Sequence, residues 1–326
     1  MLINFFIRTL SFIFISVGVF CPITKAADAF PNKPIKIFVT AAPGGTSDIA
    51  SRQLADLISK ELGQSVLVEN KAGGAGIIGI QALLSSPADG YTLAMGNIGP
   101  NAINYSLYKN LPYKMEDLEP ITVVLATPNV LVVNADFPAK SVGDLVALAK
   151  SSPGKYSFAS SGRGQSIHMS GELLKLQAGI DIFHVPYKGA GPALADLLAG
   201  QVTMMVDNLP SSMAYIRSGK LRALAVTSKN RVAELPDVPT MQQSGFPNFE
   251  VTAWFALFVP AKTPKPVIDA LYAAVKRALE TPESKQRWKD LGGWAVGDTP
   301  ANTKKFISAE KTKWEQVVSQ AKIESE

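Results

Sequence analysis

Residues 35–48 read IKIFVTAAPGGTSD. The first six, 35–40, are mostly apolar and predict a buried strand, and the small residues of 41–48 predict a tight loop. A helical pattern follows and stops at Gly63, with apolar positions at Ile49, Leu54, Leu57, Ile58 and Leu62. A strand, a glycine loop and a helix in this order are typical of an α/β sheet.

The following residues continue this alternation. A strand at 66–68 precedes the glycine loop 70–76, and a helix through Leu84 leads by the turn 87–90 to a strand at 91–95. Strands that alternate with helices on short loops predict a mainly parallel sheet with helices on its faces.

The same order of elements recurs in the middle of the chain. A strand at 155–159 precedes the loop 160–166, and a helix that stops near Gly179 leads to a strand at 182–185, the loop 187–192 and a strand at 202–206. We therefore expect two similar α/β lobes. Lobe 1 would hold residues 27–125 with 253–326, and lobe 2 would hold residues 126–252.

Two extended segments have the length to connect the lobes. Residues 121–133 and 254–259 are almost wholly apolar and predict strands. Two crossings of this kind would make a hinge. Two helices are expected after them, one beginning at Thr263-Pro264 and a last one at Thr299-Pro300.

Residues 1–26 have the layout of a secretory signal peptide. Arg8 precedes the apolar run 10–20, and small residues surround Ala26, after which we expect cleavage, with Ala29 as the alternative. The apolar run is shorter than the roughly 20 residues that span a bilayer. Cys21 follows Phe20, whereas a lipid-anchored cysteine would follow a small residue. We expect a periplasmic protein.

Composition excludes several classes of function. Removing residues 1–26 takes away Arg8 and Lys25 and leaves 30 basic against 27 acidic side chains, which gives no argument for binding nucleic acid or a membrane surface. The remaining chain has no cysteine and only His168 and His184, which excludes disulfides, thiol catalysis and a zinc site of several Cys or His. Motifs for hydrolases, metalloproteases and nucleotide binding are missing, so we expect no cofactor and no enzyme.

The ligand site is expected where the loops meet the helix N-termini. In open α/β sheets ligands bind outside the carboxyl ends of the strands, and free N–H groups with the helix dipole favour an anionic oxygen such as a carboxylate. The candidate ligand-binding residues are Ala42, Gly44, Gly45, Thr46, Ser47, Asp48, Gly74, Asn97, Ser160, Ser161, Gly162, Gly164, His168, Tyr187, Lys188, Gly189, Ala190 and Asp207.

Each candidate also has a purely structural interpretation. The glycines suit tight strand-to-helix turns whether or not a ligand is present. Asp48 is placed to cap its helix, His168 to hold its loop, and Asp207 to bond a loop instead of a ligand. His184 lies in an apolar strand and is expected to pack in the sheet, and Arg163 is either a partner for an acidic ligand group or a solvated loop residue.

Several motifs along the chain resemble one family of receptors. These motifs lie at residues 31–37, 43–48, 68–71, 87–93, 185–189, 221–227 and 236–240. Together they resemble the receptors of tripartite tricarboxylate transporters, the Bug family of periplasmic binding proteins. The likeness covers essentially the whole chain after the signal peptide.

The resemblance implies a type II periplasmic binding-protein fold with a ligand cleft between two lobes. It also implies that the loops at 42–48 and 160–168 hold ligand carboxylates through backbone amides, hydroxyls and waters, and that the receptor delivers its ligand to membrane permease subunits. Arg163 and Gln165 depart from the family pattern, in which small polar residues are commoner. This departure leaves the preference for the ligand's side chain open.

We therefore expect a monomeric receptor that closes on a small carboxylated metabolite. A sensory receptor for a membrane histidine kinase would use the same cleft and is the first alternative. An exported hydrolase that uses Ser47 or Ser166 with His168 is the second, although no acid is placed locally to orient that histidine.

Overall fold

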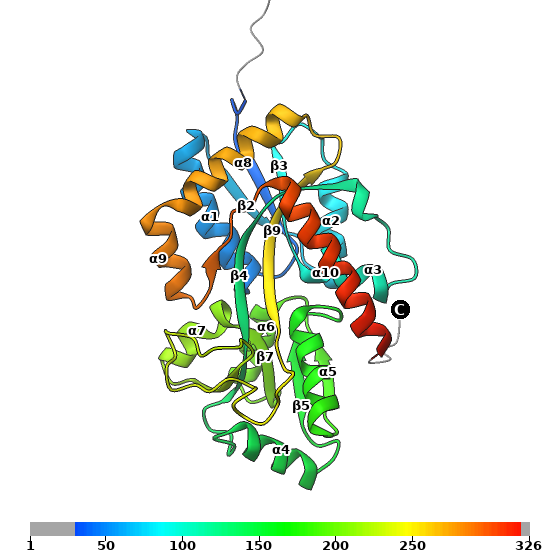
Figure 1. Cartoon of the computed structure of the whole chain (residues 1–326), viewed down its shortest axis with the longest axis vertical. Coiled ribbons are helices and arrows are strands. Elements are labelled where there is room, and N and C mark those ends of the chain that lie inside the picture. The colour runs from blue at the N-terminus through cyan, green and yellow to red at the C-terminus, as the bar shows by residue number, and fades with distance from the viewer. Residues whose placement is uncertain (1–29, 321–326) are drawn as a thin grey trace, which may run out of the picture.

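The computed structural model describes residues 30–320. Two lobes lie end to end and are joined by long strands that run along the molecule (Figure 1). The expected signal peptide, residues 1–26, lies outside the described residues. Among residues 30–320, no helix is both long and apolar enough to cross a membrane.

The sheet of lobe 1 has the strand order β2-β1-β3-β9-β4, with β10 paired to β4. The first three of these strands are parallel, and β9 runs antiparallel to both of its neighbours. The strands are β1 (Ile35–Val39), β2 (Val66–Asn70), β3 (Thr92–Asn97), β4 (Leu118–Asn134), β9 (Thr252–Pro260) and β10 (Trp294–Ala295).

The sheet of lobe 2 repeats this plan with the order β6-β5-β7-β4 and with β8 on the far side of β4. Its first three strands are again parallel, and β4 runs antiparallel to β7. The strands are β5 (Ser157–Ser160), β6 (Phe183–Pro186), β7 (Met204–Asn208) and β8 (Leu221–Val226). In each lobe, three parallel strands are thus followed by a strand that runs antiparallel to them. The recurring order of sequence elements indicated the parallel part.

Strand β4 belongs to both sheets. It pairs with β9 as far as Pro128 and with β7 from Asn129 onward. The chain returns to lobe 1 through β9, which lies beside β4 along most of its length (Figure 1). These two strands are the crossings that the extended sequence segments predicted.

Helices cover both faces of each sheet. Around lobe 1 lie α1 (Thr46–Leu62), α2 (Ile77–Leu84), α3 (Asn104–Leu107), α8 (Lys265–Glu280), α9 (Pro282–Asp290) and α10 (Pro300–Gln320), with the short turns η1 (Gly74–Gly76), η2 (Gly99–Ile103) and η3 (Met115–Asp117). Around lobe 2 lie α4 (Val142–Ser151), α5 (Ser166–Ala178), α6 (Ala190–Leu198) and α7 (Leu209–Arg217). Helix α1 ends where Gly63 adopts a left-handed conformation, as predicted.

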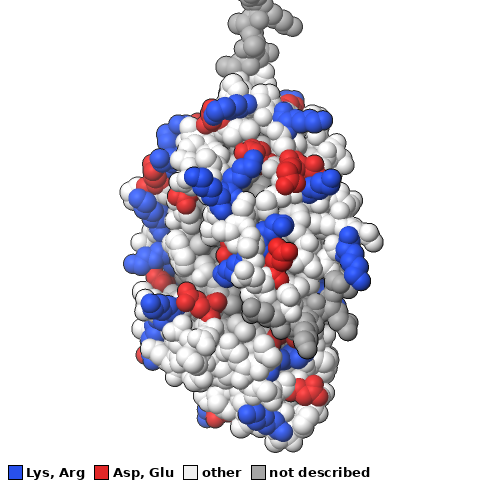
Figure 2. Space-filling model, turned by 45° about the vertical axis from the view of Figure 1, so that its right-hand side comes forward, with Lys and Arg blue, Asp and Glu red and all other residues white. Residues whose placement is uncertain are grey.

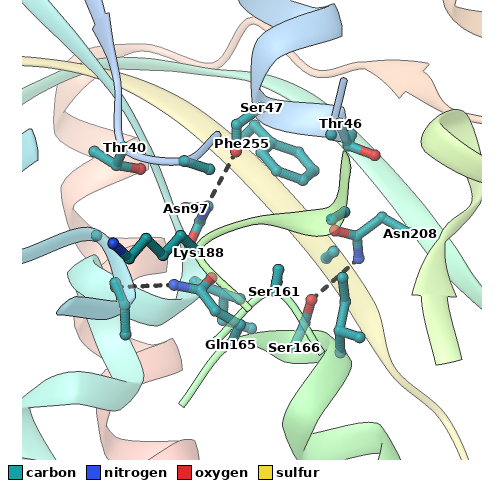
Figure 3. A pocket seen from close by; sticks show the side chains of 18 of the residues that line it. Thr40, Thr46, Ser47, Asn97, Ser161, Gln165, Ser166, Lys188, Asn208 and Phe255 are labelled. Carbon is teal, nitrogen blue, oxygen red and sulfur yellow. Dashed lines mark hydrogen bonds between the residues drawn. The ribbon is translucent and has the colours of Figure 1, made fainter. Parts of the chain in front are cut away.

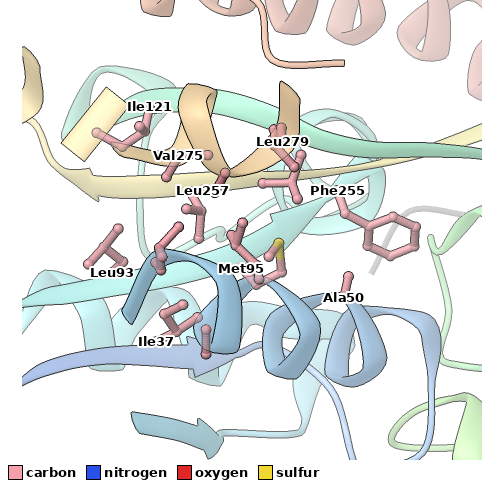
Figure 4. Packing of buried hydrophobic residues seen from close by; sticks show 14 of the residues in the cluster. Ile37, Ala50, Leu93, Met95, Ile121, Phe255, Leu257, Val275 and Leu279 are labelled. Atoms are coloured by element: carbon pink, nitrogen blue, oxygen red, sulfur yellow. The ribbon is translucent and has the colours of Figure 1, made fainter. Parts of the chain in front are cut away.

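The alternation of side chains along the strands builds a core on each face. In β1, Ile35 and Ile37 join the cluster under α1 and α8, whereas Phe38 joins the opposite one. Figure 4 shows the first of these clusters, in which Leu93, Leu257 and Val275 come from three elements far apart in the sequence. This packing fixes the positions of the loops at the ends of the strands.

Charged side chains of both signs are interspersed on the surface seen in Figure 2. The whole chain carries 32 basic and 27 acidic side chains. This surface therefore has no extended field of one sign that would attract a polyanion.

Candidate functional site

A hollow lies between the lobes, where the parallel strands of both sheets end (Figure 3). Its empty space is about 500 Å³ when the open solvent at its mouth is included. The predicted residues that line it are Gly45, Thr46, Ser47, Asn97, Ser161, Lys188 and Ala190. Lining residues absent from the prediction include Thr40, Ala41, Ala75, Gln165, Ser166, Asn208 and Phe255.

Four helices begin at or beside this cleft. Helices α1, α5 and α6 begin at the lining residues Thr46, Ser166 and Ala190, and α7 follows the lining residue Asn208 directly. Their N-terminal N–H groups and dipoles make the local potential positive. Among the described residues that line the cleft, none is acidic, and Lys188 adds a positive charge. This arrangement favours an anionic group.

Each lobe also aims one serine hydroxyl into the cleft by means of an asparagine. Asn97 at the end of β3 donates from Nδ2 to Ser47 Oγ at 3.3 Å, and Asn208 at the end of β7 donates to Ser166 Oγ at 3.1 Å. Because each serine oxygen accepts from an amide, its own hydrogen is left to donate elsewhere. Two hydroxyl donors thus supplement the helix N-termini.

Asp48 anchors the loop of lobe 1. Its carboxylate accepts from the Gly44 N–H at 3.1 Å, from Asn70 Nδ2 at 3.0 Å and from Arg52 Nε at 3.1 Å. Burial alone would raise the pKa of Asp48, but these hydrogen bonds outweigh it and lower the pKa. Asp48 is 5% exposed and does not line the cleft, and its contacts in the structure are those of a loop anchor.

Two imidazoles anchor the loop of lobe 2. His168 Nδ1 accepts from the Gly164 N–H at 3.2 Å, and His184 Nε2 lies 2.6 Å from Ser160 Oγ. Burial lowers the pKa of His168 to about 3, assisted by His184, Arg163 and Lys175. Burial likewise lowers the pKa of His184 to about 4. Both rings are therefore neutral at pH 7 and act as hydrogen-bond partners of the loop.

Two further candidates do not line the cleft. Tyr187 donates its hydroxyl to Asp196 Oδ2 at 2.6 Å and does not line the hollow. Asp207 is fully buried, which raises its pKa to about 6, and one of its oxygens accepts from Ser211 and Ser212 at 2.6 Å. The structure thus places both in loop and helix packing, and Asn208 faces the cleft in place of Asp207.

Several predicted glycines let the two lobes touch. The Ala42 N–H donates to the carbonyl of Lys188 across the cleft at 3.0 Å. A Cβ on Gly189 would lie 2.7 Å from Ala42 N, so only glycine permits this approach. The other predicted residues that do not line the cleft are Gly44, Gly74, Ser160, Gly162 and Gly164. Their backbones shape the loops beside it.

The serine and histidine arrangement of a hydrolase is not formed in this conformation. Ser47 and Ser166 accept hydrogen bonds from asparagines, and His168 is bonded to its own loop. Ser160 does contact His184, but its oxygen also accepts from the Gly162 N–H, and it is fully buried. This pair fixes the loop and has no access to the cleft.

The chain matches the sequence model of the tripartite tricarboxylate transporter family receptor over residues 50–323. It belongs to this receptor family. The receptor is 39% identical over 305 residues to the protein BugT of Bordetella pertussis, which covers 93% of each chain.

Solved structures agree with this membership. The R. palustris protein Rpa4515 with adipate is 33% identical and superimposes with a TM-score of 0.89, covering 91% of the receptor and 100% of that chain. MatC of Rhodopseudomonas palustris with bound malate is 31% identical with a TM-score of 0.84, covering 89% and 100%. The receptor therefore has the two-lobed type II periplasmic binding-protein fold.

The residues that sequence reasoning missed follow two patterns. Thr40 directly follows β1 and Asn208 ends β7, so their position at the carboxyl end of a strand was the available signal. Phe255 of the receptor lies in a crossing strand, where its apolar surroundings gave no sign of a ligand.

Proposed function

We propose that this receptor is exported to the periplasm, captures a small carboxylate between its lobes and delivers it to the permease subunits of a tripartite transporter. It acts as a monomer and without chemical change to the ligand. The observation that carries the proposal is the convergence of helix N-termini on a cleft whose described lining has no acidic side chain.

The ligand class follows from the donors in the cleft. Backbone N–H groups at α1 and α5, with the hydroxyls of Ser47 and Ser166, come from opposite lobes. A molecule with an anionic oxygen at each end would satisfy both sets only when the lobes are closed. Relatives solved with adipate and with malate support a dicarboxylate.

Calorimetry on refolded protein that begins at Ala27 tests this proposal. We expect malate or adipate to bind, and the corresponding diamide to bind at least about tenfold more weakly, because the helix N-termini favour charge. NMR of the recovered ligand should show it unchanged. Binding of the diamide as tightly as the acid, or turnover of the ligand, would contradict the proposal.

A pair of serine variants locates the binding. Ser47→Ala should weaken carboxylate binding roughly three- to tenfold through the loss of one donor. Ser59→Ala, further along the same helix with its hydroxyl on the carbonyl of Ala55, is the matched control and should bind as the wild type does. Equal affinities of both variants would place the ligand elsewhere.

A further inference from the structure

Gln165 makes a direct contact between the lobes inside the cleft. This residue precedes α5 in lobe 2, and its Nε2 donates to the carbonyl of Ala75 in lobe 1 at 2.9 Å. The side chain lies among the lining residues beneath Lys188 and Asn97 in Figure 3. With 7% exposure, Gln165 is buried by the closed arrangement.

The acceptor is held in a constrained turn. Ala75 has a φ of 50° and is the single residue other than glycine with a positive φ in the described part of the chain. Its carbonyl also accepts from Asn104 Nδ2 at 3.2 Å. This conformation is costly for alanine and turns a backbone oxygen toward two amide donors.

Lobe 1 leaves room for the glutamine at Gly99. A Cβ on Gly99 would lie 2.5 to 2.6 Å from the Nε2, Cδ and Oε1 atoms of Gln165. Gly99 lies in the helical turn η2, so its lack of a side chain is needed for space more than for backbone conformation. The glutamine amide thus fits between Gly99 and the turn at Ala75.

We propose that Gln165 is a specificity-determining latch: it holds the lobes together from inside the cleft, and its side chain limits the length of the ligand. The part of this inference that concerns ligand length rests on the proposed function. The part that concerns the latch rests on contacts within the protein alone. Shortening the side chain to alanine removes a methylene and a carboxamide, which leaves room for the two methylenes by which a six-carbon dicarboxylate exceeds a four-carbon one.

Calorimetry with malate and adipate on four proteins tests the proposal. Gln165→Ala and Gly99→Ala should each weaken malate binding roughly three- to tenfold, because each removes the amide from its place. In Gln165→Ala the ratio of malate to adipate affinity should shift toward adipate by roughly tenfold. The double variant should lose no more than Gln165→Ala alone, because Gly99→Ala acts through the glutamine.

Gln201→Ala is the matched control. Gln201 also donates from Nε2 to an alanine carbonyl, that of Ala199, but on the exposed surface of lobe 2. It should leave both affinities unchanged. Additive losses in the double variant, or a Gln165→Ala protein with the affinities of Gln201→Ala, would overturn the latch.

A protein-only measurement separates the latch from the ligand proposal. Fluorophores on Lys109→Cys and Lys150→Cys, both exposed and in different lobes, report the closed fraction by single-molecule energy transfer without ligand. Gln165→Ala and Gly99→Ala should reduce this fraction equally. If the wild type binds no carboxylate, the proposed function fails, but the energy-transfer measurement still tests the latch. A closed fraction that is undetectable in the wild type, or unchanged in the two variants, would overturn the latch.

Discussion

The loops of the two lobes are fixed in the same way by different chemistry. In lobe 1 the third residue of α1, Asp48, accepts from the N–H of Gly44, four residues earlier. In lobe 2 the third residue of α5, His168, accepts from the N–H of Gly164, also four residues earlier. Both side chains reach back over the helix start, as the acidic residue of a capping box does.

The difference lies in charge. Asp48 is ionised and offset by Arg52, whereas His168 is kept neutral by burial. Neither anchor therefore brings an unbalanced negative charge next to an anion site. The geometry of the loop requires an acceptor at this position, and the ligand requires that the acceptor carry no uncompensated charge.

Removal of the lobe 1 anchor should have the largest effect. Asp48→Ala leaves the Gly44 N–H without its acceptor and removes one acceptor each from Arg52 and Asn70, and we expect the free energy of unfolding to fall by about 3 kcal/mol. Asp48→Asn keeps one acceptor oxygen and should lose about 1 kcal/mol. Urea unfolding measures both, and an alanine variant as stable as the asparagine variant would contradict this role.

Exchanging the chemistry of the anchors should come next. His168→Asp places a carboxylate near Glu172, whose Oε1 lies 3.8 Å from His168 Nε2, and adds negative charge beside the anion site. We expect carboxylate affinity to fall about tenfold. His168→Asn offers a neutral acceptor and is the control. Equal dissociation constants for the two variants would show that charge at this position is irrelevant.

Acidification should affect the loop anchors of the two lobes at different pH values. The pKa of His168 is about 3 in the folded protein and near 6.5 in the unfolded chain. The unfolded chain binds more protons between these values, so the free energy of unfolding decreases as pH falls below about 6.5. Asp48, whose pKa is lowered from 3.8, loses its contribution only at still lower pH.

We therefore expect the lobe 2 loop to open first on acidification. In His168→Asn the decrease in unfolding free energy between pH 6.5 and 5 should be smaller by about 1 kcal/mol. Hydrogen exchange at Gly164 and Gly44 distinguishes the loops. Faster loss of protection at Gly44 than at Gly164 near pH 5 would contradict the prediction that the lobe 2 loop opens first.

The smallest effect is expected at Tyr187. Tyr187→Phe removes the hydroxyl bonded to Asp196 in the last turn of α6, which should cost about 0.5 to 1 kcal/mol of stability. Carboxylate affinity should stay the same because Tyr187 does not line the cleft. A weaker affinity, measured by calorimetry, would return Tyr187 to the ligand site.

The fold was predictable because its signals are local and repeated. The strand, glycine loop and helix at 35–62 recur at 155–178, and the repeat alone indicated two similar lobes. The loops of the cleft were found for the same reason. The clearest difference between the predicted residues and the lining of the cleft concerns Asp207 and Asn208, which are neighbours in β7. Because side chains alternate along a strand, a shift of one residue exchanges the buried face for the open one.

The contacts between the lobes could not be predicted from the sequence. Gln165 was visible as a departure from the family pattern, but its acceptor is a backbone oxygen 90 positions earlier. That oxygen belongs to Ala75, whose left-handed backbone conformation is unusual for a residue other than glycine. This conformation turns the oxygen toward Gln165. Because every residue has a backbone carbonyl, the residue type does not indicate which carbonyl accepts such a hydrogen bond.

The position of β9 between β3 and β4 also has a kinetic consequence. β3 ends at Asn97, but the neighbour that completes its pairing begins at Thr252, after all of lobe 2. Lobe 1 therefore cannot finish its sheet during synthesis until most of the chain has emerged, and closing so long a loop slows folding. Lobe 2, which is contiguous from β4 to β8, is expected to be the first to fold.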